Sequence, residues 1–78
     1  MTKILVPELG EGIVKATVAF WHVKAGDQVR EDDDIVELVT DKATFNVPAN
    51  CPGVIKDILV KEGQEARIGE ILAIIDAK

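Results

Sequence analysis

The sequence predicts an all-β fold, either a sandwich or a barrel, for a chain of 78 residues. Its apolar runs are short and alternate with polar residues, which is the period-two pattern of half-buried strands. Glycine-containing turns separate these runs, and no segment combines a helical period with a capping signal. Motifs of the first half also recur in the second half. Because a chain of this length buries only a modest core, we expect residues 1–78 to form a single domain.

The expected strands follow one another with short connections. They cover residues 3–6, 14–23, 28–30, the two arms of a hairpin over 35–48, 54–60 and 71–75. In residues 14–23 the alternation puts Val14, Ala16, Val18 and Phe20 on one face and leaves Trp21 at an edge or partly exposed. In residues 54–60 the same alternation continues without interruption.

The hairpin over residues 35–48 has a register that its apolar pattern specifies. With Asp41 and Lys42 as the two apex residues, three pairs face each other: Leu38 with Phe45, Val36 with Val47, and Glu37 with Asn46. The first two pairs are apolar and share one face, whereas the third lies on a polar face. A shift of one residue would exchange the faces, so we expect this register.

The apex of this hairpin departs from the usual turn chemistry. Two-residue hairpin turns favour Asn-Gly or Asp-Gly because both apex residues take positive φ. A lysine such as Lys42 does not favour positive φ, although a type I turn tolerates a lysine at this position. Such departures mark functional positions, so we hypothesise that Lys42 is presented to another protein. On this feature alone, the simpler interpretation is favoured, in which Lys42 is one of seven lysines and solvates a turn.

Composition excludes several classes of function. The net charge of −5 disfavours nucleic acid, which requires clustered Lys and Arg, but it permits basic partner surfaces. No run approaches the roughly 20 apolar residues of a membrane span, and no signal peptide precedes the first strand. We therefore expect a soluble, intracellular protein, or a processed or excised piece of a longer one. Cys51 is the single cysteine, which excludes an internal disulfide, and we expect a half-buried apolar role for it.

No metal site is expected either. Residues 31–34 form an acidic run, Glu-Asp-Asp-Asp. A calcium-binding EF-hand loop requires acids at alternating positions and a glycine in mid-loop, and neither is present. We therefore interpret this run as a solvated turn.

The two halves of the chain resemble each other. Residues 23–28 recur as 60–65, residues 35–39 as 71–75, and residues 12–14 as 53–55. Neither half can bury its apolar face alone, so two interlocked halves with approximate two-fold symmetry would share one core. The lysine hairpin is the connection between them.

These motifs together resemble the lipoyl domain of 2-oxo acid dehydrogenase complexes, in the dihydrolipoamide acyltransferase component. The resemblance covers the whole chain and depends on six stretches in order: residues 6–13 (VPELGEGI), 21–27 (WHVKAGD), 40–43 (TDKA), 47–49 (VPA), 52–53 (Pro-Gly) and 62–63 (Glu-Gly). One departure is Asn46, where the family often has an acid, and we expect it to affect partner affinity.

The resemblance implies a flattened barrel of two four-stranded antiparallel sheets with quasi-two-fold symmetry. Lys42 would lie at an exposed apex, opposite the termini, with its amine joined to lipoic acid through an amide bond. Partner recognition would involve the residues that flank the lysine and the loop beside it: Asp41, Ala43, Glu8, Leu9, Gly10, Glu11, Gly12 and Ile13.

The implied function is that of a non-catalytic swinging-arm carrier. The lipoyl group would carry acyl groups and electrons between the thiamine diphosphate-dependent decarboxylase, the acyltransferase core and dihydrolipoamide dehydrogenase, in a pyruvate or branched-chain complex. A lipoate ligase or lipoyl transferase would modify Lys42. The domain would be a monomer at the N-terminal part of a longer acyltransferase chain. We expect the cytoplasm in a bacterium or archaeon, and the mitochondrial matrix in a eukaryote.

Four alternatives remain open from the sequence. A biotinyl carrier domain shares the fold but usually has methionine on both sides of its lysine, and the single methionine here is Met1. A glycine-cleavage carrier is a longer protein. An enzyme that forms a Schiff base requires a desolvated lysine, whereas a turn beside Asp41 predicts a solvated one. An unmodified binding module would use the acidic run at residues 31–34.

Overall fold

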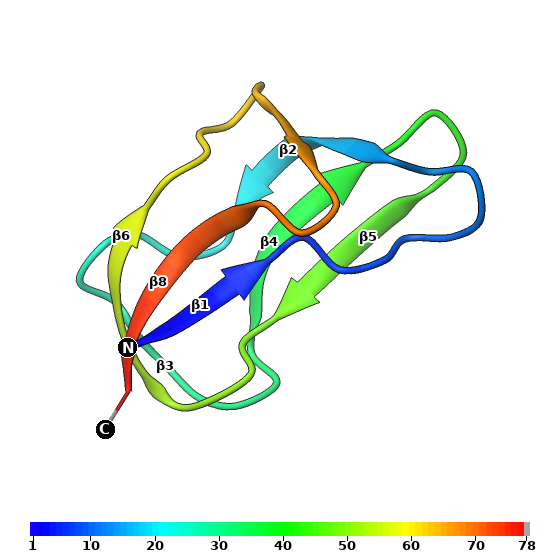
Figure 1. Ribbon diagram of the computed structural model, residues 1–78. Helices are drawn as coiled ribbons and strands as arrows, with labels where there is room; N and C mark the ends of the chain where they lie inside the picture. The colour runs from blue at the N-terminus through cyan, green and yellow to red at the C-terminus, as the bar shows by residue number, and fades with distance from the viewer. Residues whose placement is uncertain (78) are drawn as a thin grey trace.

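The computed structural model describes residues 1–77, which form eight strands and no helix. The strands are β1 (Thr2–Leu5), β2 (Lys15–Trp21), β3 (Gln28–Val29), β4 (Asp34–Val39), β5 (Thr44–Pro48), β6 (Gly53–Ile58), β7 (Glu65–Arg67) and β8 (Ile71–Ala77). They build two four-stranded antiparallel sheets, in the orders β1-β8-β6-β3 and β5-β4-β2-β7 (Figure 1). The predicted all-β fold is therefore confirmed.

The quasi-two-fold symmetry follows directly from the strand orders. Replacing β1, β2, β3 and β4 by β5, β6, β7 and β8, and the reverse, converts one sheet order into the other. Each sheet takes strands from both halves of the chain, so neither half can close a sheet alone. The repeats in the sequence thus correspond to two interlocked halves around one core, as predicted.

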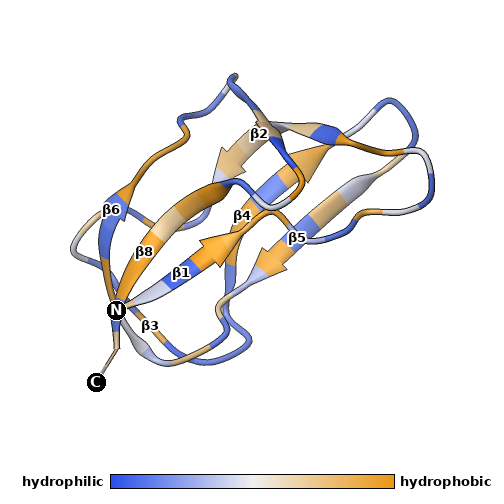
Figure 2. Ribbon diagram, in the orientation of Figure 1, coloured by the Kyte–Doolittle hydropathy of each residue, from blue (hydrophilic) through white to orange (hydrophobic). Residues whose placement is uncertain are grey.

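The core lies between the two sheets and is aliphatic. Seventeen residues form it: Ile4, Val6, Leu9, Ala16, Val18, Val29, Ile35, Val36, Leu38, Val47, Ala49, Ile55, Val60, Ala66, Leu72, Ala73 and Ile75. Among the described residues no polar or charged side chain is buried. Figure 2 shows the apolar positions concentrated on the strands and the hydrophilic positions at the turns. Stability therefore depends on apolar burial rather than on internal polar contacts.

The prediction for the face of Phe20 was wrong, because β2 contains a bulge. The register with β4 shifts between Val18 and Phe20. Ala16 and Val18 point into the core, but beyond the bulge Phe20 is exposed and Trp21 turns inward, half-buried. The Trp21 Nε1–H donates to the carbonyl of Val60 at 2.8 Å. An extra residue in one strand reverses the facing of every later residue, which simple alternation does not reveal.

A bulge also interrupts β6, at the position equivalent to that in β2. Its register with β8 shifts between Ile55 and Asp57. Ile55 is buried, Leu59 beyond the strand is exposed, and Val60 is buried again. The uninterrupted alternation expected for residues 54–60 is therefore not observed. β7, a strand of only three residues, was not predicted from the sequence.

Four turns repeat in pairs and are closed by the same kind of side-chain bond. In each, the side chain of the fourth residue accepts from the backbone N–H of the first. The four bonds are Lys24 N–Asp27 Oδ2 (2.8 Å), Lys61 N–Gln64 Oε1 (2.9 Å), Arg30 N–Asp33 Oδ2 (2.8 Å) and Arg67 N–Glu70 Oε1 (3.2 Å). Residues 31–33 of the acidic run are thus part of a structural turn, as expected, whereas Asp34 begins β4.

The lysine hairpin and the N-terminus lie at opposite ends of the molecule. Figure 1 shows the N-terminus and the end of β8 at one end, with the β4–β5 connection at the other. The molecule measures 36 × 21 × 17 Å along its principal axes, so the hairpin projects from the end of a long, flattened barrel. Over residues 1–77, no helix is long and apolar enough to span a bilayer.

Candidate functional site

The site is built on the β4–β5 hairpin, whose register is the predicted one. Leu38 pairs with Phe45, and the Val36–Val47 and Glu37–Asn46 pairs follow it. Leu38 is fully buried and Phe45 is packed against the core, so the hairpin has an apolar base. The last strand pair is Val39 with Thr44, which leaves residues 40–43 as the connection.

The turn at residues 40–43 does not use left-handed backbone. Among non-glycine residues in the described chain, only Asp32 has positive φ, so neither Asp41 nor Lys42 adopts the primed hairpin geometry. The side chain of Thr40 stabilises the turn instead. Its Oγ1 accepts from the backbone N–H of Lys42 (3.2 Å) and of Ala43 (3.1 Å). The backbone of the lysine is therefore held by a local hydrogen bond.

Lys42 is exposed at the apex of the turn, and Asp41 and Ala43 beside it are exposed as well. Within residues 1–77 the Lys42 ammonium group forms no salt bridge and no hydrogen bond. A primary amine on a four-carbon stem is thus accessible from solution, which suits enzymatic acylation. Its exposure differs from the desolvated environment that activates a Schiff-base lysine.

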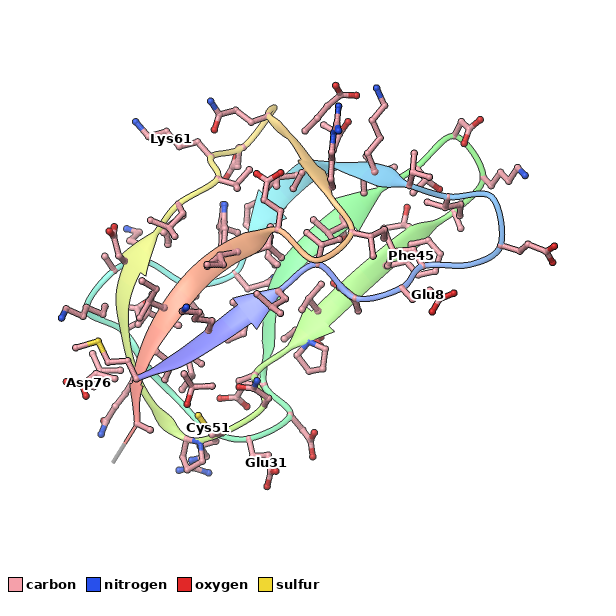
Figure 3. The ribbon with its side chains drawn as sticks, viewed as in Figure 1. Glu8, Glu31, Phe45, Cys51, Lys61 and Asp76 are labelled. Carbon is pink, nitrogen blue, oxygen red and sulfur yellow. The ribbon has the colours of Figure 1, made fainter. Side chains whose placement is uncertain are left out.

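The loop over residues 8–13 lies beside this hairpin, but its residues differ in exposure. Glu8, Gly10, Glu11 and Gly12 are exposed, and Figure 3 shows the Glu8 carboxylate directed away from the body of the domain. Ile13 is half-buried and packs against the core. Leu9 is buried, so its side chain anchors the loop rather than being available to a partner.

A groove of about 470 Å³ separates the loop from the hairpin. The groove is lined by Gly12, Ile13, Val14, Lys15, Ala16, Thr17, Val39, Thr40, Asp41, Lys42 and Glu65. It brings together four of the predicted site residues, Gly12 and Ile13 from the loop and Asp41 and Lys42 from the turn. The remaining predicted residues, Glu8, Leu9, Gly10, Glu11 and Ala43, do not line it.

Sequence reasoning missed three features of the groove. Val14 was expected in a strand but precedes β2 and is 69% exposed, so it presents an apolar surface beside the lysine. Lys15 and Glu65 form an ion pair at 3.2 Å along one wall. The motif at residues 40–43 predicted no separate role for Thr40. Its tendency to bond to nearby backbone N–H groups was the available signal for its role.

Elsewhere the described residues offer little chemistry. Cys51 is half-buried, as expected, and lies at the end of the barrel that carries Asp76 (Figure 3). The His22 Nε2 lies 3.3 Å from the Asn46 Oδ1 on the outer face of β4 and β5. In the part of the chain that the structure describes, no group of three or more His, Cys, Asp or Glu side chains could hold a metal ion. The lysine turn is therefore the best-supported site.

Comparisons with known proteins support the resemblance to lipoyl domains. Residues 2–75 match the family model described as "Biotin-requiring enzyme", which covers biotinyl and lipoyl domains. The chain is 38% identical over 72 residues to the dihydrolipoyllysine-residue acetyltransferase component of pyruvate dehydrogenase complex of Staphylococcus aureus, and 38% identical over 72 residues to that of Staphylococcus epidermidis. Each match covers 92% of this chain but 17% of the relative. The chain therefore spans about a sixth of the length of these relatives.

A solved structure supports the same assignment. The solution structure of the lipoyl domain of the 2-oxoglutarate dehydrogenase complex of Azotobacter vinelandii is 39% identical, with a TM-score of 0.77. The match covers 96% of this chain and 95% of that one. The chain belongs to the biotinyl and lipoyl domain family, as a domain of the lipoyl type found in 2-oxo acid dehydrogenase complexes.

Proposed function

We propose that this domain is a swinging-arm acyl carrier whose Lys42 side chain is joined to lipoic acid by an amide bond. The observation that supports it most strongly is the exposed amine at the apex of a hairpin with a buried base. A carrier arm needs a long flexible stem, which the lysine provides, and a rigid origin, which the paired strands provide. The domain would do no chemistry with its own side chains.

The residues present fit this cofactor. Lys42 is solvent-exposed, so forming the amide requires no rearrangement of the core and buries no charge. The lost ammonium charge takes the formal net charge from −5 to −6, which makes the domain more acidic. When attached, lipoate supplies a strained cyclic disulfide that accepts an acyl group and electrons and passes them on. Lipoate is favoured over biotin because Asp41 and Ala43, not methionines, flank the lysine.

The neighbouring surface would contribute to recognition. Asp41 and Ala43 flank the arm at its root, and Gly12 and Ile13 face it across the groove. Glu8 and Glu11 extend the acidic surface of the loop. A decarboxylase that accepts this domain would bind these residues, because they lie within reach of any active site that the arm enters.

The wider context is part of the same proposal. The relatives named above are acetyltransferase components of pyruvate dehydrogenase complexes, and this chain corresponds to about a sixth of them. We infer that the domain acts within such an acyltransferase, at its N-terminal part, as a monomeric unit. Its partners would be the decarboxylase, the acyltransferase core, dihydrolipoamide dehydrogenase and a lipoate-attaching enzyme. Tethering of the domain by a linker would raise the effective concentration of the arm to roughly millimolar order. The compartment would be the cytoplasm in a bacterium or archaeon and the mitochondrial matrix in a eukaryote.

Reductive acylation tests the proposal. The lipoylated chain is incubated with a pyruvate, a 2-oxoglutarate or a branched-chain 2-oxo acid decarboxylase and the labelled 2-oxo acid, and acyl transfer to the domain is measured. We expect transfer with one decarboxylase and none to Lys42→Arg, which keeps the charge but not the amide site. Lys56→Arg, an exposed lysine on β6, is the matched control and should be acylated normally. Acylation of the Lys42→Arg variant would refute the proposal.

A further inference from the structure

The lysine turn lacks the backbone hydrogen bond that closes an ordinary β-turn. In such a turn the N–H of the fourth residue donates to the carbonyl of the first. Here the Ala43 N–H donates to the Thr40 Oγ1 at 3.1 Å. Within residues 1–77 no bond runs from the Ala43 N–H to the Thr40 carbonyl. The hydroxyl oxygen of Thr40 therefore takes the place of that carbonyl as the hydrogen-bond acceptor.

The same hydroxyl uses its full hydrogen-bonding capacity within the turn. A threonine hydroxyl has one donor and two acceptor positions. Oγ1 accepts from Lys42 N–H at 3.2 Å and from Ala43 N–H at 3.1 Å, and it donates to the Ala43 carbonyl at 3.1 Å. That carbonyl also accepts from the Thr40 N–H at 2.8 Å. One side chain therefore fixes the backbone on both sides of the Lys42 stem.

This arrangement is the reverse of the other side-chain-capped turns. In those four turns the side chain of the fourth residue bonds back to the N–H of the first. In the lysine turn the side chain of the first residue bonds forward to the third and the fourth. In each of those four turns the N–H of the third residue donates to a backbone carbonyl elsewhere in the chain. In the lysine turn the Lys42 N–H is instead held by the Thr40 side chain. The exception coincides with the residue to be modified.

We propose that Thr40 is a positioning residue for the modification of Lys42. Its hydroxyl restrains the turn in the conformation that presents the amine, so that a lipoate-attaching enzyme binds a preformed site. Without the hydroxyl, the Lys42 and Ala43 N–H groups bond to water, because both residues are exposed, and the turn samples more conformations. Ordering it again on binding would weaken recognition by the enzyme. This inference rests on the proposed function of Lys42.

Three variants of the 78-residue chain separate the hydroxyl from other effects. Thr40→Val keeps the branched shape but removes the hydroxyl, and Thr40→Ser keeps the hydroxyl but removes the methyl group. Thr44→Val is the control, since Thr44 is exposed on β5 and its hydroxyl forms no hydrogen bond among the described residues. For each variant, NMR measures water exchange of the Lys42 and Ala43 amides. Steady-state kinetics with a lipoate–protein ligase give KM and kcat for the unmodified domain.

We expect Thr40→Val to speed exchange of both amides about fivefold, the change that follows from losing one ordinary hydrogen bond. Its KM for the ligase should rise about fivefold with kcat unchanged, because binding and not chemistry is affected. Thr40→Ser and Thr44→Val should match the unsubstituted chain in both measurements. Unchanged exchange or unchanged KM in Thr40→Val would overturn the inference, as would a KM increase that Thr40→Ser shares.

The two proposals fail in different ways. If no ligase lipoylates the unsubstituted chain, the proposed function fails, whereas the amide exchange still reports whether the hydroxyl restrains the turn. If the unsubstituted chain and Thr40→Val are lipoylated with equal KM, the carrier function stands and the positioning role of Thr40 is refuted.

Discussion

The buried base of the lysine hairpin should account for a large part of the stability of this domain, and Leu38→Ala tests it. Leu38 is 0% exposed, pairs with Phe45 across the hairpin and with Val18 on β2, and lies in the centre of one sheet. Truncating a fully buried leucine costs about 3–5 kcal/mol, from lost apolar transfer and the cavity left behind. A domain of this size has roughly 4–12 kcal/mol in total. The variant should therefore lose roughly a quarter or more of the free energy of unfolding.

Leu59→Ala is the matched control, because it is the same substitution at a side chain that is 45% exposed. Burying about half of a leucine contributes roughly 1 kcal/mol. Thermal unfolding followed by circular dichroism gives both values, and each kcal/mol corresponds to about 4–8 °C in Tm for a domain of this length. We expect Leu38→Ala to lower Tm by at least about 12 °C and Leu59→Ala by less than about 8 °C. Equal shifts for the two variants would contradict the assignment of the hairpin base to the core.

Three further substitutions test other parts of the fold. Gly53→Ala would place a Cβ 2.5 Å from a backbone carbonyl oxygen of β8. The free energy of unfolding in urea should therefore fall by about 1–3 kcal/mol. An unchanged urea midpoint would contradict the close approach of β6 to β8. Trp21→Phe removes the indole N–H that donates to the carbonyl of the buried Val60. The free energy of unfolding, followed by circular dichroism, should fall by about 1–2 kcal/mol, and an unchanged value would show that this bond contributes nothing. Glu65→Gln removes the exposed ion pair with Lys15. At low and at high salt, its free energy of unfolding should differ from that of the unsubstituted chain by less than about 1 kcal/mol.

The register of the lysine hairpin could be predicted from the sequence because two independent constraints agree there. Only one alignment puts Leu38 opposite Phe45 and also leaves a two-residue apex. The repeat of glycine turns and apolar runs likewise identified two interlocked halves, which the strand orders confirm. In both cases the pattern is local and periodic, so a few residues determine it.

The bulges and the groove could not be predicted in the same way. An alternating run such as residues 14–23 looks continuous whether or not it contains an extra residue, and only pairing with β4 reveals the shift that turns Phe20 outward. The groove depends on how a loop and a turn approach each other in space, which no local pattern encodes. Thr40 lay within the motif, but its bonds depend on the conformation of the whole turn.

The most direct test of the account is enzymatic modification of the purified chain in two parallel reactions. One contains a lipoate–protein ligase with lipoate, and the other a biotin–protein ligase with biotin; intact mass and peptide mapping then locate any added group. We predict that one lipoyl group is added, at Lys42, and that the biotin reaction leaves the chain unchanged. Addition at another lysine, or biotin at Lys42, would contradict the claim that this turn presents a lipoyl-accepting amine.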